Sequence, residues 1–218
     1  MCNRHTRFTR EEEIANAVSH LLGALLAVAG LVIMLIHAAR NGNGWHITSV
    51  SIFGAAMILL YLSSSFNHIL KPGKLKDFFF NFDQVAIFLL IAGTYTPVSL
   101  IVLKGALGWT IFGIEWGLAL TGILLKIRKP ARFESGVNLF YIFTYIIMGW
   151  MILVAIVPLV HRLPIMGWMW IFIGGISYSA GVIFFKLARF RFHHLIWHLL
   201  VMAGSAAHFF AVFFYMLP

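Results

Sequence analysis

The chain has 218 residues, of which 61% are hydrophobic and only 11% charged, and its mean hydropathy is +0.92. Soluble domains carry about 25% charged residues, so this composition excludes an ordinary soluble module and predicts an integral membrane protein. The formal net charge of +9 would suit a nucleic-acid partner, but no soluble basic module remains for that role, and we expect no nucleic-acid binding.

Seven apolar runs follow one another along the chain, each close to the roughly 20 residues that a helix needs to cross a hydrocarbon core of about 30 Å. A helix satisfies its own backbone hydrogen bonds in lipid, so each run predicts a transmembrane helix. The predicted helices span residues 14–39, 46–69, 82–103, 106–127, 138–159, 165–187 and 194–217. Their connections are short, the longest being Lys71–Asn81 and Arg128–Gly136. The sequence therefore predicts an all-α, seven-transmembrane-helix bundle that forms a single domain over residues 1–218.

The basic residues are divided unevenly between the two predicted sides of the membrane. If the N-terminus is cytosolic, three basic residues fall outside, namely Arg40, Lys104 and Arg162. Thirteen then fall on the cytosolic side: Arg4, Arg7, Arg10, Lys71, Lys74, Lys76, Lys126, Arg128, Lys129, Arg132, Lys186, Arg189 and Arg191. Cytosolic loops carry an excess of Lys and Arg, so we predict a cytosolic N-terminus and an external C-terminus. The same charges suit contact with anionic lipid headgroups.

The first predicted helix opens with three polar residues on one face. Glu13, Asn16 and His20 are spaced i, i+3, i+7, so they lie on one side of its cytosolic turns. Two interpretations stand beside each other here: an outer shell or substrate contact for a site in the bundle, or a wet helix end at the membrane interface.

Four further polar residues fall at one depth, just below the predicted cytosolic interface. His68 ends the second predicted helix, Asp83 opens the third, and His194 and His198 open the seventh. The i, i+4 spacing puts the last two imidazoles on one helix face, about 6 Å apart along the axis. Three imidazoles with an open fourth position are typical of catalytic zinc, so His68, His194 and His198 are predicted to bind Zn²⁺.

Asp83 and Ser64 are the candidate catalytic residues beside this metal. A carboxylate near a zinc-activated water can accept its proton, and Ser64 lies four residues before His68 on the same face, where its hydroxyl can orient the water or receive a substrate oxygen. Direct ligation of the metal by Asp83 is an alternative. Each histidine also has a simpler interpretation as an interhelical hydrogen-bonding group. His193 is spaced five residues from His198 and is predicted to point elsewhere.

Three other features stand out in the apolar runs. Pro97 with Gly93 predicts a bend in the third helix, which serves either a cavity or packing alone. Glu115 sits near mid-membrane, where an ionised carboxylate is expensive. His208 shares the face of His194 but lies about 21 Å farther along the helix, which is too far for the same metal; an interhelical hydrogen bond or a cavity-lining position is expected.

The sequence resembles the hemolysin III family, the bacterial branch of the progestin and adipoQ receptor (PAQR) superfamily. The matching pieces are "EEEIANAVSHLLGALLAVAG", "SSSFNHIL", "FDQVAIFLLIAGTYTPVSL" and "HHLIWHLLVMAGSAAHFFAV". The resemblance implies a seven-helix bundle, with zinc held by His68, His194 and His198 and with Asp83 and Ser64 beside it.

From the resemblance we also expect an activity on membranes. Related receptors and ceramidases look like zinc-dependent hydrolases of lipid amides, which implies a lipid-like substrate, membrane lipid homeostasis and a place in the bacterial inner membrane. The alternative is a non-enzymatic sensor, a receptor-like protein or a pore-forming, cytolytic protein in which zinc is structural. A third interpretation, proton or ion transport, rests on Glu115 and His208.

Overall fold

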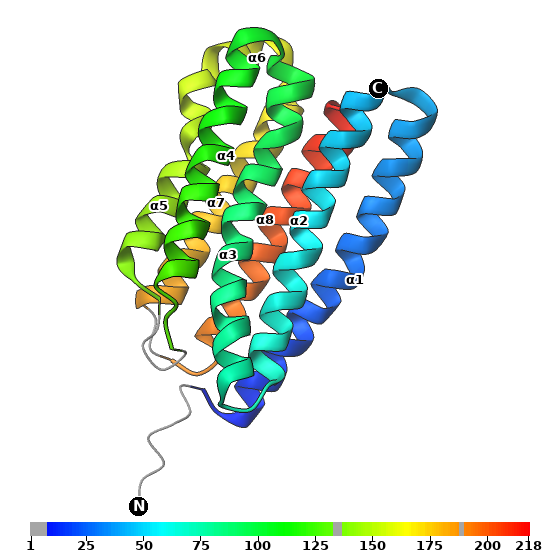
Figure 1. Cartoon of the computed structure of the whole chain (residues 1–218). Helices are drawn as coiled ribbons and strands as arrows, with labels where there is room; N and C mark the ends of the chain where they lie inside the picture. Colours follow the sequence, from blue (N-terminus) through cyan, green and yellow to red (C-terminus); the bar gives the residue numbers. More distant parts are fainter. Residues whose placement is uncertain (1–7, 133–136, 188–189) are drawn as a thin grey trace, which may run out of the picture.

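The computed structural model describes residues 8–132, 137–187 and 190–218, and over these residues it consists of helices and their connections (Figure 1). Arg4, Arg7, Arg189 and part of the predicted Arg128–Gly136 connection lie outside the described residues. The described part of the chain begins at one end of the bundle, and the C-terminus lies at the other. We call these the N-terminal end and the opposite end.

The helices are numbered in chain order. They are α1 (Arg10–Asn41), α2 (Gly44–Ile69), α3 (Lys74–Pro97), the π-helix η1 (Val98–Leu103), α4 (Gly105–Arg128), α5 (Leu139–Gly149), the 3₁₀-helix η3 (Met151–Ala155), α6 (Ile156–Arg162), α7 (Ile165–Leu187) and α8 (His193–Tyr215). In the described residues, seven helical spans are long and apolar enough to cross a membrane. The prediction of an all-helical chain with seven such spans is confirmed.

Two spans begin earlier than predicted because their first turns are polar. α1 begins at Arg10, since Thr9 and Glu12 form a capping box in which each side chain accepts from the other residue's backbone N–H. α3 begins at Lys74, so the predicted loop Lys71–Asn81 is wrong for most of its length. Hydropathy marks only the part of a helix suited to the hydrocarbon core, and it misses turns that continue into the interface.

The predicted fifth helix, residues 138–159, is interrupted. α5 ends at Gly149, the tighter η3 follows, and α6 resumes at Ile156. Pro158 has no N–H to donate to the carbonyl four residues earlier, so a regular α-helix cannot run through this stretch with all its hydrogen bonds. The predicted bend at Pro97 is likewise a local change of helix type, from α3 to the π-helix η1.

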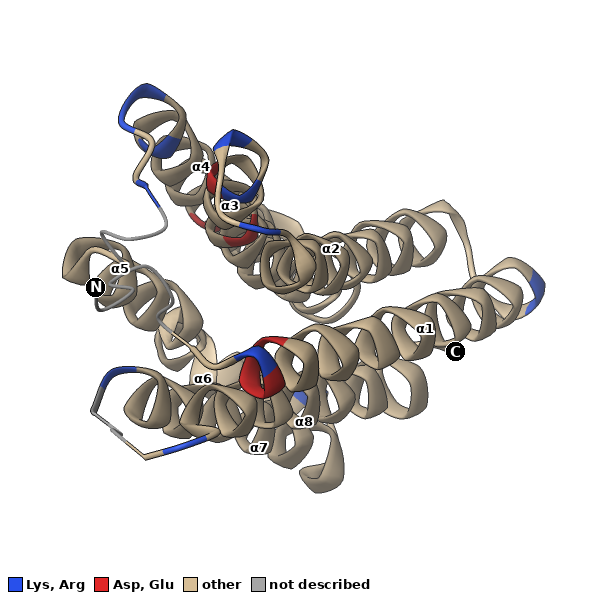
Figure 2. Cartoon of the chain, turned by 90° about the horizontal axis from the view of Figure 1, so that it is seen from below, with Lys and Arg blue, Asp and Glu red and all other residues tan. Residues whose placement is uncertain are grey.

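The spans are arranged around a ring. α1 contacts α2, which contacts α3, and the sequence of contacts continues through α4, α5, α7 and α8 back to α1. Seen from the N-terminal end, α2, α3 and α4 form one row and α1, α8 and α7 another, with α5 at the open side between them; the described Lys and Arg residues gather mainly at this end (Figure 2). Every span thus has one face toward the interior and one toward the surroundings.

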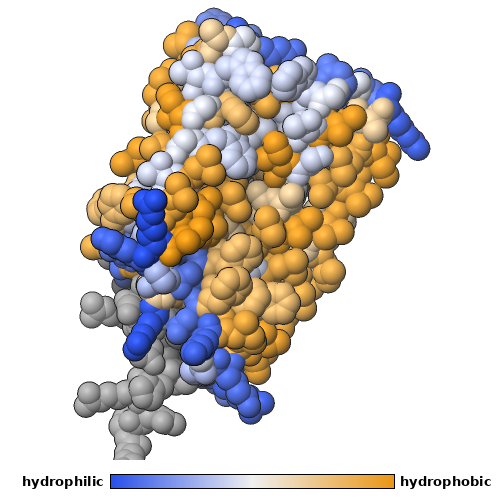
Figure 3. All heavy atoms as spheres, viewed as in Figure 1, coloured by the Kyte–Doolittle hydropathy of each residue, from blue (hydrophilic) through white to orange (hydrophobic). Residues whose placement is uncertain are grey.

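On the face seen in Figure 3, apolar residues cover much of the surface, and the most hydrophilic residues gather toward the two ends of the bundle. Large aliphatic side chains stay on the outside, such as Leu26 with 66% and Val154 with 73% of its surface exposed. Water would oppose such exposure, whereas lipid tails accept it at no cost. The pattern is that of an integral membrane protein.

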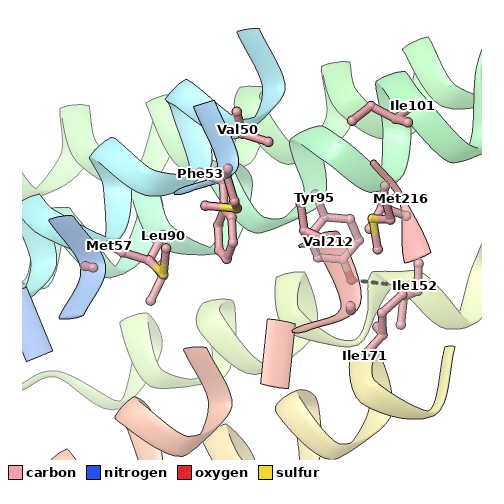
Figure 4. Close-up of a cluster of buried hydrophobic side chains, with 14 of the residues drawn as sticks. Val50, Phe53, Met57, Leu90, Tyr95, Ile101, Ile152, Ile171, Val212 and Met216 are labelled. Atoms are coloured by element: carbon pink, nitrogen blue, oxygen red, sulfur yellow. Dashed lines mark hydrogen bonds between the residues drawn. The ribbon is translucent and has the colours of Figure 1, made fainter. Parts of the chain in front are cut away.

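The interior core lies between α2, α3 and α8, with η3 closing it (Figure 4). Phe53 and Val50 of α2 and Val212 of α8 are essentially inaccessible. Tyr95 adds a polar link to this core: its hydroxyl donates to the Gly149 carbonyl at 2.9 Å and accepts from the Ile152 N–H at 2.7 Å. One side chain of α3 therefore satisfies the backbone where α5 gives way to η3.

Candidate metal centre

Three histidines meet at the N-terminal end of the bundle. His68 lies in the last turn of α2, while His194 and His198 lie in the first turns of α8. One ligand nitrogen from each lies within 4.8 Å of the other two, and the cluster is buried. The ring centroids are 4.7 Å apart for His194 and His198 and 5.0 Å for each of these with His68. The sequence prediction that these three rings converge is confirmed.

For two of the three rings, the hydrogen bond made by the nitrogen that faces away from the cluster shows which nitrogen carries the proton. The Nδ1 atom of His68 lies 2.6 Å from Oε2 of Glu13, and Nδ1 of His198 lies 3.1 Å from the carbonyl oxygen of Asn16. A carboxylate and a carbonyl only accept, so each Nδ1 carries the proton and donates. Nε2 of each ring is then left with a lone pair for a metal.

α1 supplies most of this outer layer. The His20 ring stacks on His198 with centroids 3.5 Å apart and an interplanar angle of 9°, and the Ser19 hydroxyl lies 3.1 Å from the Nδ1 atom of His198. Glu13, Asn16 and His20 therefore all touch the histidine cluster, which favours the outer-shell interpretation over the wet helix end. Asn16 takes part through its backbone carbonyl, a contact that its side-chain type could not reveal.

Two further contributors escaped the sequence analysis. Lys76, counted there only as an orientation charge, is buried, and its Nζ donates to Oε1 of Glu13 at 2.9 Å and to the Leu70 carbonyl at 3.2 Å. Ser19 also donates to the Asn16 carbonyl at 2.8 Å. Glu13, Asn16 and Ser19 follow one another at intervals of three residues, and this helical spacing is the one feature of the sequence that indicates Ser19.

Asp83 and Ser64, the predicted catalytic pair, lie close enough for the Ser64 hydroxyl to act on the Asp83 carboxyl group. Both line a cavity of about 130 Å³ that extends into the bundle interior between largely apolar walls. Asp83 also lines a smaller pocket of about 60 Å³ whose wall includes His68 and His194. Ile87, Tyr145, Val182 and Trp197 border both spaces as well. The carboxyl group thus stands where the histidine pocket meets the apolar cavity.

The donor set fits a zinc ion. Three neutral imidazoles are suitable ligands, with Zn–N distances of about 2.0–2.1 Å, and both assigned rings already have outer partners of the kind found around metal-bound histidines. Two nitrogens bonded to one tetrahedral zinc lie about 3.4 Å apart, so ligand nitrogens that lie within 4.8 Å of one another need to move by about 1 Å to close around an ion. These residues can therefore hold a metal; the protein donors alone do not distinguish zinc from neighbouring transition metals.

The remaining predicted polar residues lie apart from the cluster. The Nδ1 atom of His193 lies 2.8 Å from the Phe190 carbonyl, and among the described residues His193 is not part of the group that could hold a metal ion. His208 lines the apolar cavity and stacks on Tyr178 with a centroid distance of 5.6 Å, as expected. Glu115 is fully buried, and neither of its carboxyl oxygens has a hydrogen-bond partner among the residues described.

Comparison with known proteins gives one consistent family. A family model described as haemolysin-III related matches residues 8–209. The protein named Hemolysin-3 from Bacillus cereus is 46% identical over 220 residues, covering 100% of this chain and 99% of that protein. A Hemolysin-3 homolog from Bacillus subtilis is 48% identical over 208 residues, covering 95% and 96%. The human monocyte to macrophage differentiation factor is more distant, at 26% identity over 211 residues, covering 94% and 84%.

Proposed function

This chain belongs to the haemolysin-III related family, and on that premise we propose that it is a zinc-dependent hydrolase of lipid amides or esters, acting within the membrane on lipid homeostasis. The observation that carries the proposal is the position of Asp83. Its carboxyl group borders both the histidine pocket and the apolar cavity. A reacting carbonyl held between the two spaces would have the metal ligands on one side and room for an apolar chain on the other.

His68, His194 and His198 would hold the ion. Zinc bound there would polarise a substrate carbonyl and make water a stronger nucleophile at neutral pH. Glu13 and the Asn16 carbonyl hold the ligand rings with Nε2 toward the cluster. Since these acceptors are fixed by α1, the ligand orientation is set before any substrate enters.

Asp83 is the proposed general base and acid. In this role its carboxylate accepts the proton of the attacking water and then returns it to the leaving amine or alcohol. Ser64, which lines the same cavity as Asp83, would orient that carboxylate or stabilise the oxyanion. The interior cavity, walled by side chains such as Leu90, Ile91 and Val201, excludes bulk water and would accept the hydrocarbon part of a lipid.

The charge distribution supports an orientation for the same site. The described Lys and Arg residues gather mainly at the N-terminal end, the end that holds the histidines, and such an excess is typical of cytosolic loops. We therefore place the metal centre near the cytosolic face of a bacterial inner membrane, with lipids as partners and substrate source.

The second candidate is a non-enzymatic protein with a structural metal, a sensor or a cytolytic protein as the relatives' printed name suggests. It is favoured by the network in which His68, Glu13 and Lys76 join α2, α1 and α3. A metal added to that network would tie α8 to the other helices without any turnover.

Comparing turnover by wild type and by Asp83→Asn distinguishes the enzymatic proposal from the protein with a structural metal. Purified, zinc-loaded wild type is given a panel of fluorescent ceramides, acyl amides and acyl esters, and zinc content is measured on the same samples. The enzymatic proposal expects product from at least one substrate, and at least a 100-fold loss with Asp83→Asn at unchanged zinc content. No product from any substrate, or product that persists in Asp83→Asn, would overturn it; lysis of liposomes by the wild type in that case would favour the cytolytic alternative.

A further inference from the structure

A polar pocket of about 260 Å³ lies at the opposite end of the bundle from the histidine cluster. It forms where the start of α2 meets the turn between η1 and α4. Its walls include Trp45, His46, Ser99, Lys104, Gly105 and Trp109. The hydrolase proposal does not use this pocket. The interior cavity has largely apolar walls, whereas this pocket is lined by hydrogen-bond donors such as Lys104, His46 and the tryptophans.

The pocket carries a positive charge with no acidic side chain near it in the sequence. Lys104 is exposed, and it has no ion pair with another residue of the described ranges. The seven acidic residues of the chain all lie elsewhere in the sequence, at positions 11, 12, 13, 77, 83, 115 and 134. No carboxylate is therefore available to neutralise Lys104 from α2, η1 or α4 at this end.

His46 contributes a second donor. Its Nδ1 atom lies 3.2 Å from the Asn43 backbone nitrogen and 2.9 Å from Oδ1 of Asn43. In the tautomer whose Nδ1 accepts from the Asn43 N–H, the proton is on Nε2 and can be donated to an anion. Lys104 lines the same pocket as this imidazole. An anion between the two groups would receive one charged and one neutral hydrogen bond.

The start of α4 and the Ser99 hydroxyl complete the donor set. α4 has no side-chain cap at its N-terminus, and the residue before it, Lys104, and its first residue, Gly105, have positive φ angles of 50° and 57°. Uncapped helix N-termini attract anions. The Ser99 hydroxyl is buried in the wall of this pocket and has no hydrogen-bond partner among the described residues. It is an unpartnered polar group in the same wall as Lys104 and His46.

Two exposed tryptophans indicate that the pocket lies at the depth of the lipid headgroups. Trp45 and Trp109 are 52% and 51% exposed and meet edge to face with centroids 5.6 Å apart. Tryptophan gathers at the headgroup level of membrane proteins. From this combination we propose that the pocket binds a phosphate group at the membrane surface, most directly the phosphodiester of an anionic phospholipid, through Lys104, His46, Ser99 and the first amides of α4.

The test is binding of a fluorescent, short-chain phosphatidylglycerol to the purified full-length protein in neutral detergent. Lys104→Gln and Ser99→Ala should each weaken binding about ten-fold or more, because each removes a hydrogen bond to a charged group. Arg40→Gln is the matched control, since it removes a cation from the same end without touching the pocket wall. His68→Ala should leave this binding unchanged and so separate the site from the metal centre.

Two competitors identify the source of the phosphate. Displacement by unlabelled phosphatidylglycerol but not by inorganic phosphate assigns the lipid headgroup, and displacement by inorganic phosphate at similar concentration assigns a free anion; both support a phosphate site. The proposal is overturned if diacylglycerol, which lacks phosphate, competes equally well. It is also overturned if Lys104→Gln and Ser99→Ala, with unchanged melting temperatures, bind like wild type, or if Arg40→Gln loses as much affinity as Lys104→Gln.

Discussion

The Nδ1 atom of His68 lies 2.6 Å from the Oε2 atom of Glu13, so a carboxylate of α1 holds a ring of α2 by the nitrogen that faces away from the cluster. The other oxygen of Glu13 accepts from Lys76 at 2.9 Å. The ion pair fixes the carboxylate, and the carboxylate fixes the ring. A metal at the cluster would therefore meet a ligand whose tautomer and direction are already set.

Glu13→Gln is expected to weaken zinc binding by about 10- to 100-fold, the range usual for loss of an outer partner of a ligating histidine. The amide keeps the size of the side chain but removes the negative charge that favours the Nδ1–H donor. The measurement is competition for zinc with a fluorescent chelator. Glu11→Gln is the control, because Glu11 is paired only with exposed Arg191 at 3.3 Å in the described structure. Equal zinc affinity in wild type and Glu13→Gln would contradict this role.

Much of the fold could be predicted because lipid imposes simple rules on a sequence. Long apolar runs must be helices, and the seven predicted spans are present in the structure. The boundaries were less accurate, since Lys74 opens α3 eight residues before the predicted start at residue 82. The break between α5 and α6 was not predicted because hydropathy carries no signal of a change in helix type; Pro158 is the residue in the sequence that indicates it.

The site was predictable where the side chain itself carries the chemistry. His68, His194 and His198 are recognisable from residue type, spacing and depth together. Ser19, Lys76 and the Asn16 carbonyl were not, because their roles depend on which groups α1 and α3 bring within hydrogen-bonding distance. Backbone acceptors in particular leave no trace in a sequence.

Gly108→Ala is expected to destabilise the protein by at least about 1–3 kcal/mol, the usual cost of overpacking. A Cβ atom at Gly108 would lie 2.2 Å from the carbonyl oxygen of Ser99, a backbone atom that cannot rotate away. Gly113→Ala in the same helix is the matched control, because its Cβ would have no neighbour within 4 Å among the described atoms. Thermal unfolding in detergent should show a clearly lower midpoint for Gly108→Ala alone; equal midpoints would mean that α4 and η1 are not this close.

Tyr95→Phe is expected to cost about 1–3 kcal/mol, since it leaves the buried N–H of Ile152 without its acceptor and the Gly149 carbonyl without its donor. The volume of the core changes little, so the loss reports on the hydroxyl. Reversible unfolding by a denaturing detergent is a suitable measurement. Tyr215→Phe provides the comparison, as its hydroxyl makes no hydrogen bond within the described part of the chain. A Tyr95→Phe protein as stable as Tyr215→Phe would argue against the link between α3 and η3.

Removal of the metal should lower the melting temperature of wild type but not that of a variant that lacks one of the three histidines. A ligand that binds the folded state alone stabilises it by about 4 kcal/mol at a concentration 1,000 times its dissociation constant. A chelator should therefore lower the melting temperature of wild type by several degrees, and readdition of zinc should restore it. His198→Ala should melt at the lower temperature with or without the chelator. A chelator-induced decrease of the same size in His198→Ala would place the responsible metal elsewhere.

The binding of one zinc ion by the three histidines is the claim on which the proposed chemistry depends, and elemental analysis of purified protein tests it directly. Wild type and His193→Ala are expected to carry close to one zinc per chain. His68→Ala, His194→Ala and His198→Ala are expected to carry almost none while remaining folded. Wild type without zinc after purification and zinc loading, or ligand variants that retain as much zinc as His193→Ala, would contradict the account.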